Sequence, residues 1–331
     1  MTTLNAPSQP MPESVAVEPM PQKPRTVWRD AVDRIKQNRT AMVAMAVLGI
    51  YIVTAIAGFT PTLDRARDAV VSGANQPPFH NEAGNVTFAP ALWFGTDFLG
   101  RSVLWRFLYG ARVAMTVAIF AAVVETLIGL TLGALAGYFG GWVDALVIWL
   151  FSTIASIPYI LLMIALAYAL QGRMLWAPWT KEGYVPMAGI PTIILALGLS
   201  SWVALCRLIR GEVLKHRDRD YVVAARAAGF GHLRIIFRHI LPNVFHIVII
   251  NFSLALAGYV QAEVVLSFLG LGVTDRPSWG RMIDDAKLEL LKGVWWQLAS
   301  ATAAIFIFSL AVNIFGDALR DALDPHLRGV D

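Results

Sequence analysis

The sequence predicts an all-α membrane protein with six transmembrane helices. Of its 331 residues, 56% are hydrophobic and only 15% are charged, whereas soluble domains have about 25% charged residues. A helix needs about 20 consecutive, mostly apolar residues to cross a hydrocarbon core about 30 Å thick. Six segments meet this requirement: residues 41–60, 113–138, 145–170, 187–206, 240–262 and 294–316.

The distribution of lysine and arginine predicts the orientation. With six spans both termini lie on one side, which would hold sixteen of the 27 Lys and Arg residues. Eight of these lie in the loop of residues 207–239 and six in the N-terminal tail, next to spans, where the positive-inside rule applies. We therefore expect both termini and this loop in the cytoplasm. Residues 61–112, 171–186 and 274–293 are then expected outside.

The spans divide the chain into four regions. Residues 1–26 are polar and proline-rich, which predicts a disordered cytoplasmic tail. Residues 27–112 hold the first span and a long outward loop. Residues 113–316 form a core of five helices that includes the 207–239 loop between spans four and five, and residues 317–331 form a cytoplasmic C-terminal tail.

The second predicted span has two unusual features. Gly129, Gly133 and Gly137 recur every four residues, a spacing that lets helices pack closely; a gating role is the alternative. Glu125 is an ionisable group in mid-span, where such groups are costly and by default functional. It either lines a path through the membrane or pairs with a neighbouring helix, and the sequence leaves both interpretations open.

Other positions carry structural expectations. Pro158 predicts a kink in the third span, and His246 predicts a satisfied group at a helix interface rather than a ligand. Residues 264–273 (VVLSFLGLGV) are too short to cross and predict a re-entrant or interfacial segment. Glu263, beside this run, is expected to fix its turn by accepting backbone N–H bonds, with a position facing a path as the alternative.

The 207–239 loop predicts a helix–turn–helix on the cytoplasmic face. The alanines of residues 224–228 favour a short helix, and Gly229 and Gly231 end it. A second amphipathic stretch leads to Pro242, at the start of the fifth span, where proline is tolerated. The alanine face would let another protein approach closely. The alternative is a basic loop that only fixes topology.

The sequence offers no motif for catalysis or for a bound cofactor. It has no G-x-x-x-x-G-K-[ST] loop to hold phosphates, no H-E-x-x-H and no G-x-S-x-G. Its single cysteine, Cys206, excludes an intrachain disulfide and a Cys-based metal cluster. The net charge of +4 is too small to predict nucleic-acid binding. We therefore expect neither an enzyme nor a cofactor or metal site in this chain.

Four segments, in order, resemble one family of transport proteins. Residues 220–229 (DYVVAARAAG) with 238–243 (RHILPN) are similar to the EAA loop of ABC importer permeases. Residues 95–112, with GTDFLGR and LYGAR, and residues 263–280, with EVVLSFLGLGV and PSWG, agree with it. The resemblance is to the C-type permease of the dipeptide/oligopeptide/nickel family and covers about residues 27–327. Val223 stands where the general pattern has an acid, and we take Asp220 as its equivalent.

The resemblance implies a mechanical contact in place of a catalytic centre. In this family a short cytoplasmic coupling helix of each permease lies in a groove of an ATPase subunit. ATP binding closes the ATPases, and the coupling helices carry that motion into the spans as a rigid-body movement. The residues implied in the contact are Asp220, Tyr221, Ala224, Ala225, Arg226, Gly229, Phe230, Gly231, His239, Leu241 and Pro242.

The resemblance also implies partners and a location. A second permease forms a heterodimer with this one in the plasma (inner) membrane of a bacterium or archaeon. Two ATPase subunits, or one fused ATPase, bind ATP and Mg, and an extracytoplasmic binding protein delivers the cargo. Peptides are the expected cargo, with a nickel chelate, glutathione or an oligosaccharide as alternatives. An ion-coupled secondary transporter is less favoured, because the sequence shows no internal repeat and only one firm mid-span acid.

Overall fold

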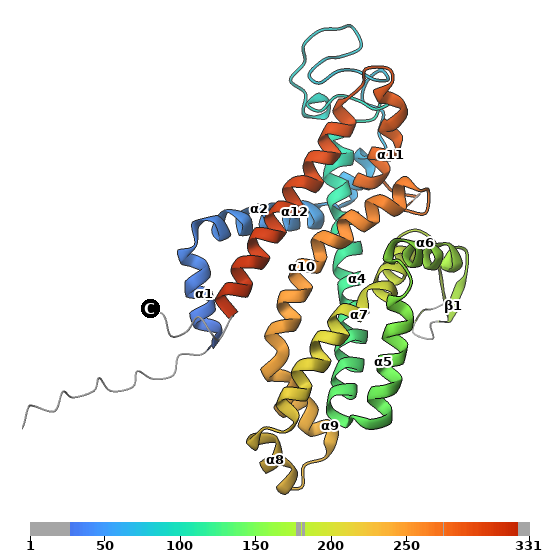
Figure 1. Ribbon diagram of the computed structural model, residues 1–331. Coiled ribbons are helices and arrows are strands. Elements are labelled where there is room, and N and C mark those ends of the chain that lie inside the picture. The colour runs from blue at the N-terminus through green and yellow to red at the C-terminus, as the bar shows by residue number, and fades with distance from the viewer. Residues whose placement is uncertain (1–26, 177–179, 181–182, 274, 324–331) are drawn as a thin grey trace, which may run out of the picture.

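The structure is a bundle of long helices with smaller elements at both ends (Figure 1). The computed structural model describes residues 27–176, 180, 183–273 and 275–323. Both the predicted disordered tail, residues 1–26, and residues 324–331 lie outside the described part. The helices are α1 (Val27–Gln37), α2 (Arg39–Ala57), α3 (Pro61–Ala66), η1 (Pro90–Leu92), α4 (Val103–Phe139), α5 (Gly141–Ala155), α6 (Tyr159–Leu170), α7 (Ile190–Arg217), α8 (Asp220–Ala227), α9 (His232–Ile235), the π-helix η2 (Ile236–Ile240), α10 (Leu241–Phe268), α11 (Trp279–Leu290) and α12 (Trp296–Leu323). One antiparallel hairpin pairs β1 (Met174–Trp176) with β2 (Tyr184–Pro186).

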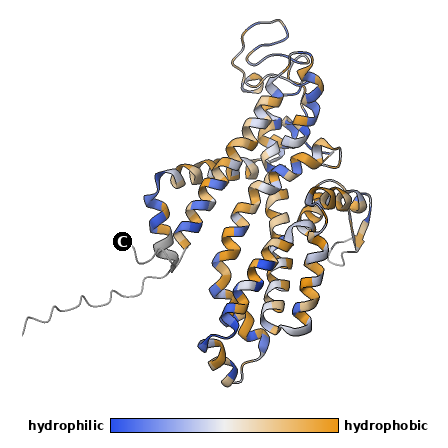
Figure 2. Cartoon of the chain, in the orientation of Figure 1, coloured by the Kyte–Doolittle hydropathy of each residue, from blue (hydrophilic) through white to orange (hydrophobic). Residues whose placement is uncertain are grey.

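Five helical segments of the described chain are long and apolar enough to cross a membrane. They are α2, α4, α7, the continuous segment His232–Phe268 that ends with α10, and α12. Hydrophobic residues cover their bodies, and hydrophilic residues gather toward the ends, as at α8 and α11 (Figure 2). The mostly helical, multi-span fold class is therefore confirmed.

The third predicted span is broken into two helices. α5 and α6 are long and apolar enough to cross a membrane only when they are taken together, and their axes are bent by 93°. Pro158 precedes the first residue of α6 and has an extended ψ of 128°; as a proline it cannot donate a helical hydrogen bond. The kink predicted there is confirmed, but it is a full break, so the described residues hold five candidate spans, or six if the bent pair counts as one.

Several boundaries differ from the predicted ones. α4 begins at Val103 rather than at residue 113, α7 continues to Arg217, and α12 continues to Leu323. The first part of the predicted 207–239 loop and residues 317–323 of the predicted C-terminal tail are thus helical. The sequence-based boundaries stopped at the first charges, but a helix satisfies its own backbone hydrogen bonds and can continue beyond the apolar layer.

The apolar run at residues 264–273 is not a separate re-entrant segment, so that alternative was wrong, whereas an interfacial position stays a prediction. α10 includes its first half and ends at Phe268, and Gly270 then turns the chain with φ +76°. The turn is crowded, because a Cβ on Gly272 would lie 1.9 Å from Ser267 Oγ and one on Gly280 would lie 2.7 Å from Ser267 Cβ. Both glycines are needed where α11 folds back onto the end of α10.

The glycine row of α4 packs against α7, as its spacing predicted. A Cβ on Gly129 would lie 3.0 Å from the Trp202 carbonyl oxygen, and one on Gly133 would lie 2.7 Å from the Cys206 carbonyl oxygen. A Cβ on Gly137 would lie 2.7 Å from the Arg210 carbonyl oxygen. The two helices are parallel and in close contact at three positions spaced four residues apart, so they form one body.

Candidate functional site

The helix α8 lies at the end of the molecule opposite α11 (Figure 1). Its inner side is anchored by Val222 (0% exposed) and Ala225 (5% exposed), which belong to a buried cluster with Ile235, Ile236 and Ile240. The carboxylate of Asp220 in the first turn favours the helix, because the N-terminal end carries a partial positive charge. The predicted helix–turn–helix is therefore present, with α9 and η2 as its second arm.

The outer side of α8 is an exposed, mostly apolar surface. Tyr221 is 36% and Val223 51% exposed, and Ala224 and Ala227 are exposed as well. The surface continues beyond α8 over Phe230, Leu233 and Phe237, which are 39%, 60% and 65% exposed. We call these seven residues the α8 surface. Its small side chains and exposed aromatic rings fit the groove of another protein better than they fit water.

Gly229 shapes the end of α8. Its φ is +78°, in the left-handed region, and its N–H donates to the Arg226 carbonyl while Phe230 N–H donates to the Ala225 carbonyl. A Cβ at Gly229 would meet nothing within 4 Å, so the requirement for glycine there is one of backbone conformation alone. Gly231, in contrast, has φ −66° and precedes α9, so it starts the second arm rather than ending the first.

Arg226 makes contacts within its own chain. Its guanidinium carbon lies 5.4 Å from the ring centroid of Tyr138, at the end of α4, and Nη2 donates to the Arg217 carbonyl at 3.4 Å. The side chain is exposed and keeps donors for a carboxylate of another protein, a contact that stays a prediction. Arg226 thus connects the α8 surface to the longest helix of the bundle.

Further contacts attach the α8–α9 unit to the bundle. Tyr221 OH hydrogen-bonds His216 Nδ1 at 2.8 Å, and Tyr138 OH hydrogen-bonds His232 Nδ1 at 2.9 Å. Burial raises the pKa of the Tyr221 phenol, so this hydroxyl stays protonated. The His239 ring lies 5.6 Å from that of Phe230.

At the start of α10, Leu241 is buried and Pro242 is exposed. The structure therefore brings the predicted contact residues to one end of the molecule, although Leu241 packs inward.

Glu125 is paired with α10. It is 5% exposed, and its two carboxylate oxygens accept from Asn251 Nδ2 at 3.2 Å and from Tyr259 OH at 2.5 Å. The geometry supports the interpretation that Glu125 pairs with a neighbouring helix. The other interpretation, a role of Glu125 in a path through the membrane, stays a prediction.

Two other expectations are only partly met. Glu263 is completely buried, but it accepts from the Ser267 hydroxyl at 2.6 Å and not from a backbone N–H. His246 Nδ1 bonds the Asn243 carbonyl of its own helix, so it is satisfied locally rather than at a helix interface.

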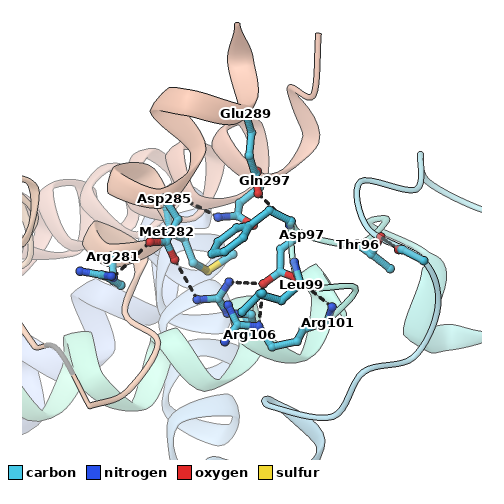
Figure 3. A network of polar contacts seen from close by, with 12 residues as sticks. Thr96, Asp97, Leu99, Arg101, Arg106, Arg281, Met282, Asp285, Glu289 and Gln297 are labelled. Carbon is cyan, nitrogen blue, oxygen red and sulfur yellow. Dashed lines mark hydrogen bonds and ion pairs between the residues drawn. The ribbon is translucent and has the colours of Figure 1, made fainter. Parts of the chain in front are cut away.

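A buried network of charges lies at the opposite end of the molecule, beside α11 (Figure 3). Its ion pairs were not predicted from the sequence. Asp97 is 0% exposed and accepts from Arg101 Nε at 2.7 Å and from Arg106 Nη1 at 2.6 Å. Arg106, 3% exposed, donates through Nη2 to Asp285 of α11 at 3.1 Å, and Arg281 also pairs with Asp285. The network joins the loop before α4, the first turns of α4, and α11.

Two more contacts close the same end. Glu289 Oε1 accepts the backbone N–H of Phe98 at 2.9 Å, and Trp296 Nε1 donates to the Thr96 carbonyl at 2.9 Å. Residues 95–101 were recognised as a motif, but sequence spacing gave no sign that Asp285 and Glu289 lie next to them. The sequence did contain one signal: arginine and aspartate occur beside a span. An unpaired charge would be costly there, which indicates that these side chains pair with one another.

Comparisons with known proteins agree with this geometry. The family described as "Binding-protein-dependent transport system inner membrane component" matches residues 129–329, and the "N-terminal TM domain of oligopeptide transport permease C" matches residues 26–78. The chain is 35% identical to the dipeptide transport system permease protein DppC of Bacillus subtilis over 91% of this chain and 86% of that protein. It is 32% identical to the oligopeptide transport system permease protein OppC of the same organism over 94% and 93%. Identity to the glutathione transport system permease protein GsiD of Pectobacterium atrosepticum is also 32%, over 92% and 93%.

Proposed function

Because the chain belongs to the family of binding-protein-dependent transport system inner membrane components, we propose that it forms, with a second permease, the translocation path of an ATP-driven importer of peptides. The relatives above are named for transport of dipeptides, oligopeptides and glutathione, which are all short chains of amino acids. Peptide cargo is therefore the proposal that these names support.

The single observation that carries the mechanism is the α8 surface. It is apolar and exposed, yet its helix is anchored through Val222 and Ala225 and tied to α4 and α7 through tyrosine and arginine contacts. A surface of this kind can receive a push from a docked protein without detaching from the bundle. We propose that separate ATPase subunits, with their ATP and Mg, dock on it, and that their closure moves α8 together with α4 and α7.

The same proposal fixes the orientation. The α8 end must face the cytoplasm, where ATP is available, and the Asp97–Arg106–Asp285 end must face the binding protein outside. A cysteine placed at Ser72, in a background with Cys206 replaced, should react with an impermeant reagent added outside intact cells. A cysteine placed at His232 should not react, and the reverse pattern would refute this orientation.

The test of docking uses the complete transporter. We expect Val223→Lys to release the ATPase subunits on purification, because it places a positive charge in the middle of the α8 surface, at a position where the general pattern has an acid. The matched control is Val86→Lys, since Val86 is 62% exposed in the outer loop and should leave ATPase retention unchanged. Full retention and full peptide uptake in Val223→Lys would contradict the docking proposal.

A further inference from the structure

Four carboxamide side chains interrupt the apolar surface of α10 and α12. Asn243, Gln261 and Asn313 are exposed and Asn251 is half-buried, although both helices are long and apolar enough to cross a membrane. At 100° per residue, the three on α10 fall within an arc of about 80°. At a rise of 1.5 Å per residue, Asn243 and Gln261 are about 27 Å apart, close to the thickness of the hydrocarbon core. Gln261 Nε2 donates to Ser309 of α12 at 3.3 Å, which places Asn313, one turn further along α12, beside this stripe.

Three of the four amides, those of Asn243, Asn251 and Asn313, are held in the same sense by partners that can only accept, whereas Gln261 faces the Ser309 hydroxyl, which can donate or accept. The NH₂ group of Asn243 donates to the His239 carbonyl at 2.7 Å, and that of Asn313 donates to the Ser309 carbonyl at 2.8 Å. The NH₂ group of Asn251 donates to the Glu125 carboxylate. Carbonyl and carboxylate oxygens only accept, so the orientation of these amides is fixed by chemistry. Their side-chain oxygens accept no hydrogen bond within the described residues.

These four side chains therefore form a stripe that presents amide oxygens as hydrogen-bond acceptors at successive depths of the membrane. Their NH₂ groups are already bonded within the chain. Polar groups at this depth are costly against lipid and normally face the protein interior or a water-filled cavity. The opposite face of α10 behaves differently. It borders an apolar cavity of about 450 Å³, with Phe245, Val248 and Phe252 among its lining residues.

We propose that these four amide oxygens line the translocation path and hydrogen-bond the backbone N–H groups of the moving peptide. The proposal rests on the proposed function and names the part of the cargo that this chain recognises. An extended peptide advances about 3.3 Å per residue, so it brings an N–H group near each acceptor whatever its side chains are. A single amide oxygen binds a peptide N–H group only weakly, so the peptide can leave each acceptor again.

The first test maps access in the complete transporter, with Cys206 replaced by alanine. Single cysteines at Asn251, Gln261 and Asn313 should react with a water-soluble cationic thiosulfonate at least ten times faster than a cysteine at Phe245, the matched control on the apolar face. Binding protein loaded with peptide, together with ATP, should slow the three reactions. Equal rates at all positions, or no reaction at the three, would overturn the proposal. Cross-linking of the unreactive cysteines to the partner permease would show that the stripe is a subunit interface instead.

The second test asks whether peptide N–H groups are the ligand. Uptake of a peptide is compared with uptake of the same peptide carrying backbone N-methyl groups, in the wild type and in the double variant Gln261→Met, Asn313→Leu. The double variant should raise the KM for the ordinary peptide several-fold, leave the KM for the methylated one nearly unchanged, and retain its ATPase subunits. An equal change for both peptides would overturn recognition of N–H groups. Absence of peptide uptake in the wild type would instead refute the proposed function itself.

Discussion

The two ends of the bundle are built in opposite ways. At the end that contains α11, which we propose to face outward and call the outer end, Asp97 and Arg106 are buried and paired, and the loop, α4 and α11 are joined by charges shielded from water. At the α8 end, the buried cluster around Val222 is apolar, further apolar side chains such as Val223 and Leu233 are exposed, and the polar contacts that hold the unit lie near the surface. Large apolar side chains such as Phe88 and Leu291 are exposed at the outer end too, so the two ends differ in how their parts are joined: by buried ion pairs at the outer end and by polar contacts near the surface at the α8 end. The comparison indicates that stability should respond mostly to changes at the first end and coupling to changes at the second.

The largest expected effect on stability is at the outer end. Asp97→Asn keeps the shape of the side chain but removes the charge that Arg106 faces, and breaking a buried pair from one side costs about 3–5 kcal/mol. The thermal unfolding temperature of the purified transporter should fall clearly. Arg281→Gln is the control, because that side chain is 38% exposed and exposed pairs contribute about 1 kcal/mol or less. Similar losses in both variants would contradict the contrast between buried and exposed charges.

The next effect concerns the body that connects the ends. In Gly133→Ala the new methyl group would lie 2.7 Å from the Cys206 carbonyl oxygen, and overpacking of this kind costs about 1–3 kcal/mol. We expect a lower unfolding temperature and loss of uptake together. Gly211→Ala on α7 is the matched control, because nothing lies within 4 Å of its Cβ and alanine favours the helix. If Gly133→Ala unfolds like Gly211→Ala, the close packing of α4 on α7 is wrong.

A smaller effect on stability is expected at the α8 end, with a larger effect on coupling. Gly229→Ala forces a Cβ into a left-handed conformation at a cost of about 1 kcal/mol, with no clash. The unfolding temperature should hardly change, while uptake per ATP hydrolysed should fall, because the turn that presents Phe230 is altered. Gly231→Ala is the control, since Gly231 has φ −66°. Unchanged coupling in Gly229→Ala would remove the functional meaning of this turn.

The smallest effect is a pH dependence at the outer end. Burial raises the pKa of Glu289 above the ordinary carboxyl range, and the hydrogen bond from Phe98 N–H only partly opposes this. A pKa raised on folding contributes stability below the unfolded pKa, and this contribution is lost as the pH rises through the folded pKa. The unfolding temperature should therefore decrease slightly over that range in the wild type and less in Glu289→Gln. Identical pH profiles would show that Glu289 does not titrate in this range.

Local patterns predicted local features well. The spans, the alanine helix, the kink at Pro158 and the end of the short helix at Gly229 each follow from a few neighbouring residues. The glycine spacing of α4 also predicted close packing, because such a row has little other use in a helix. What sequence patterns missed are contacts between distant residues. Neither the pairing of Glu125 with Tyr259 nor that of Arg106 with Asp285 leaves a trace in spacing, since the partners lie on helices that meet only in the folded bundle.

The length of α4 has a mechanical consequence. Its Tyr138 lies beneath Arg226 and against His232, and its Arg106 holds Asp97 and Asp285. At 1.5 Å per residue these two positions are about 48 Å apart along one uninterrupted helix. If a rigid helix of this length tilts by about 5° around its middle, its two ends each move by about 2 Å, in opposite directions. If docking displaced α8 toward the bundle axis, such a tilt would displace the charge network of Asp97, Arg106 and Asp285 away from it.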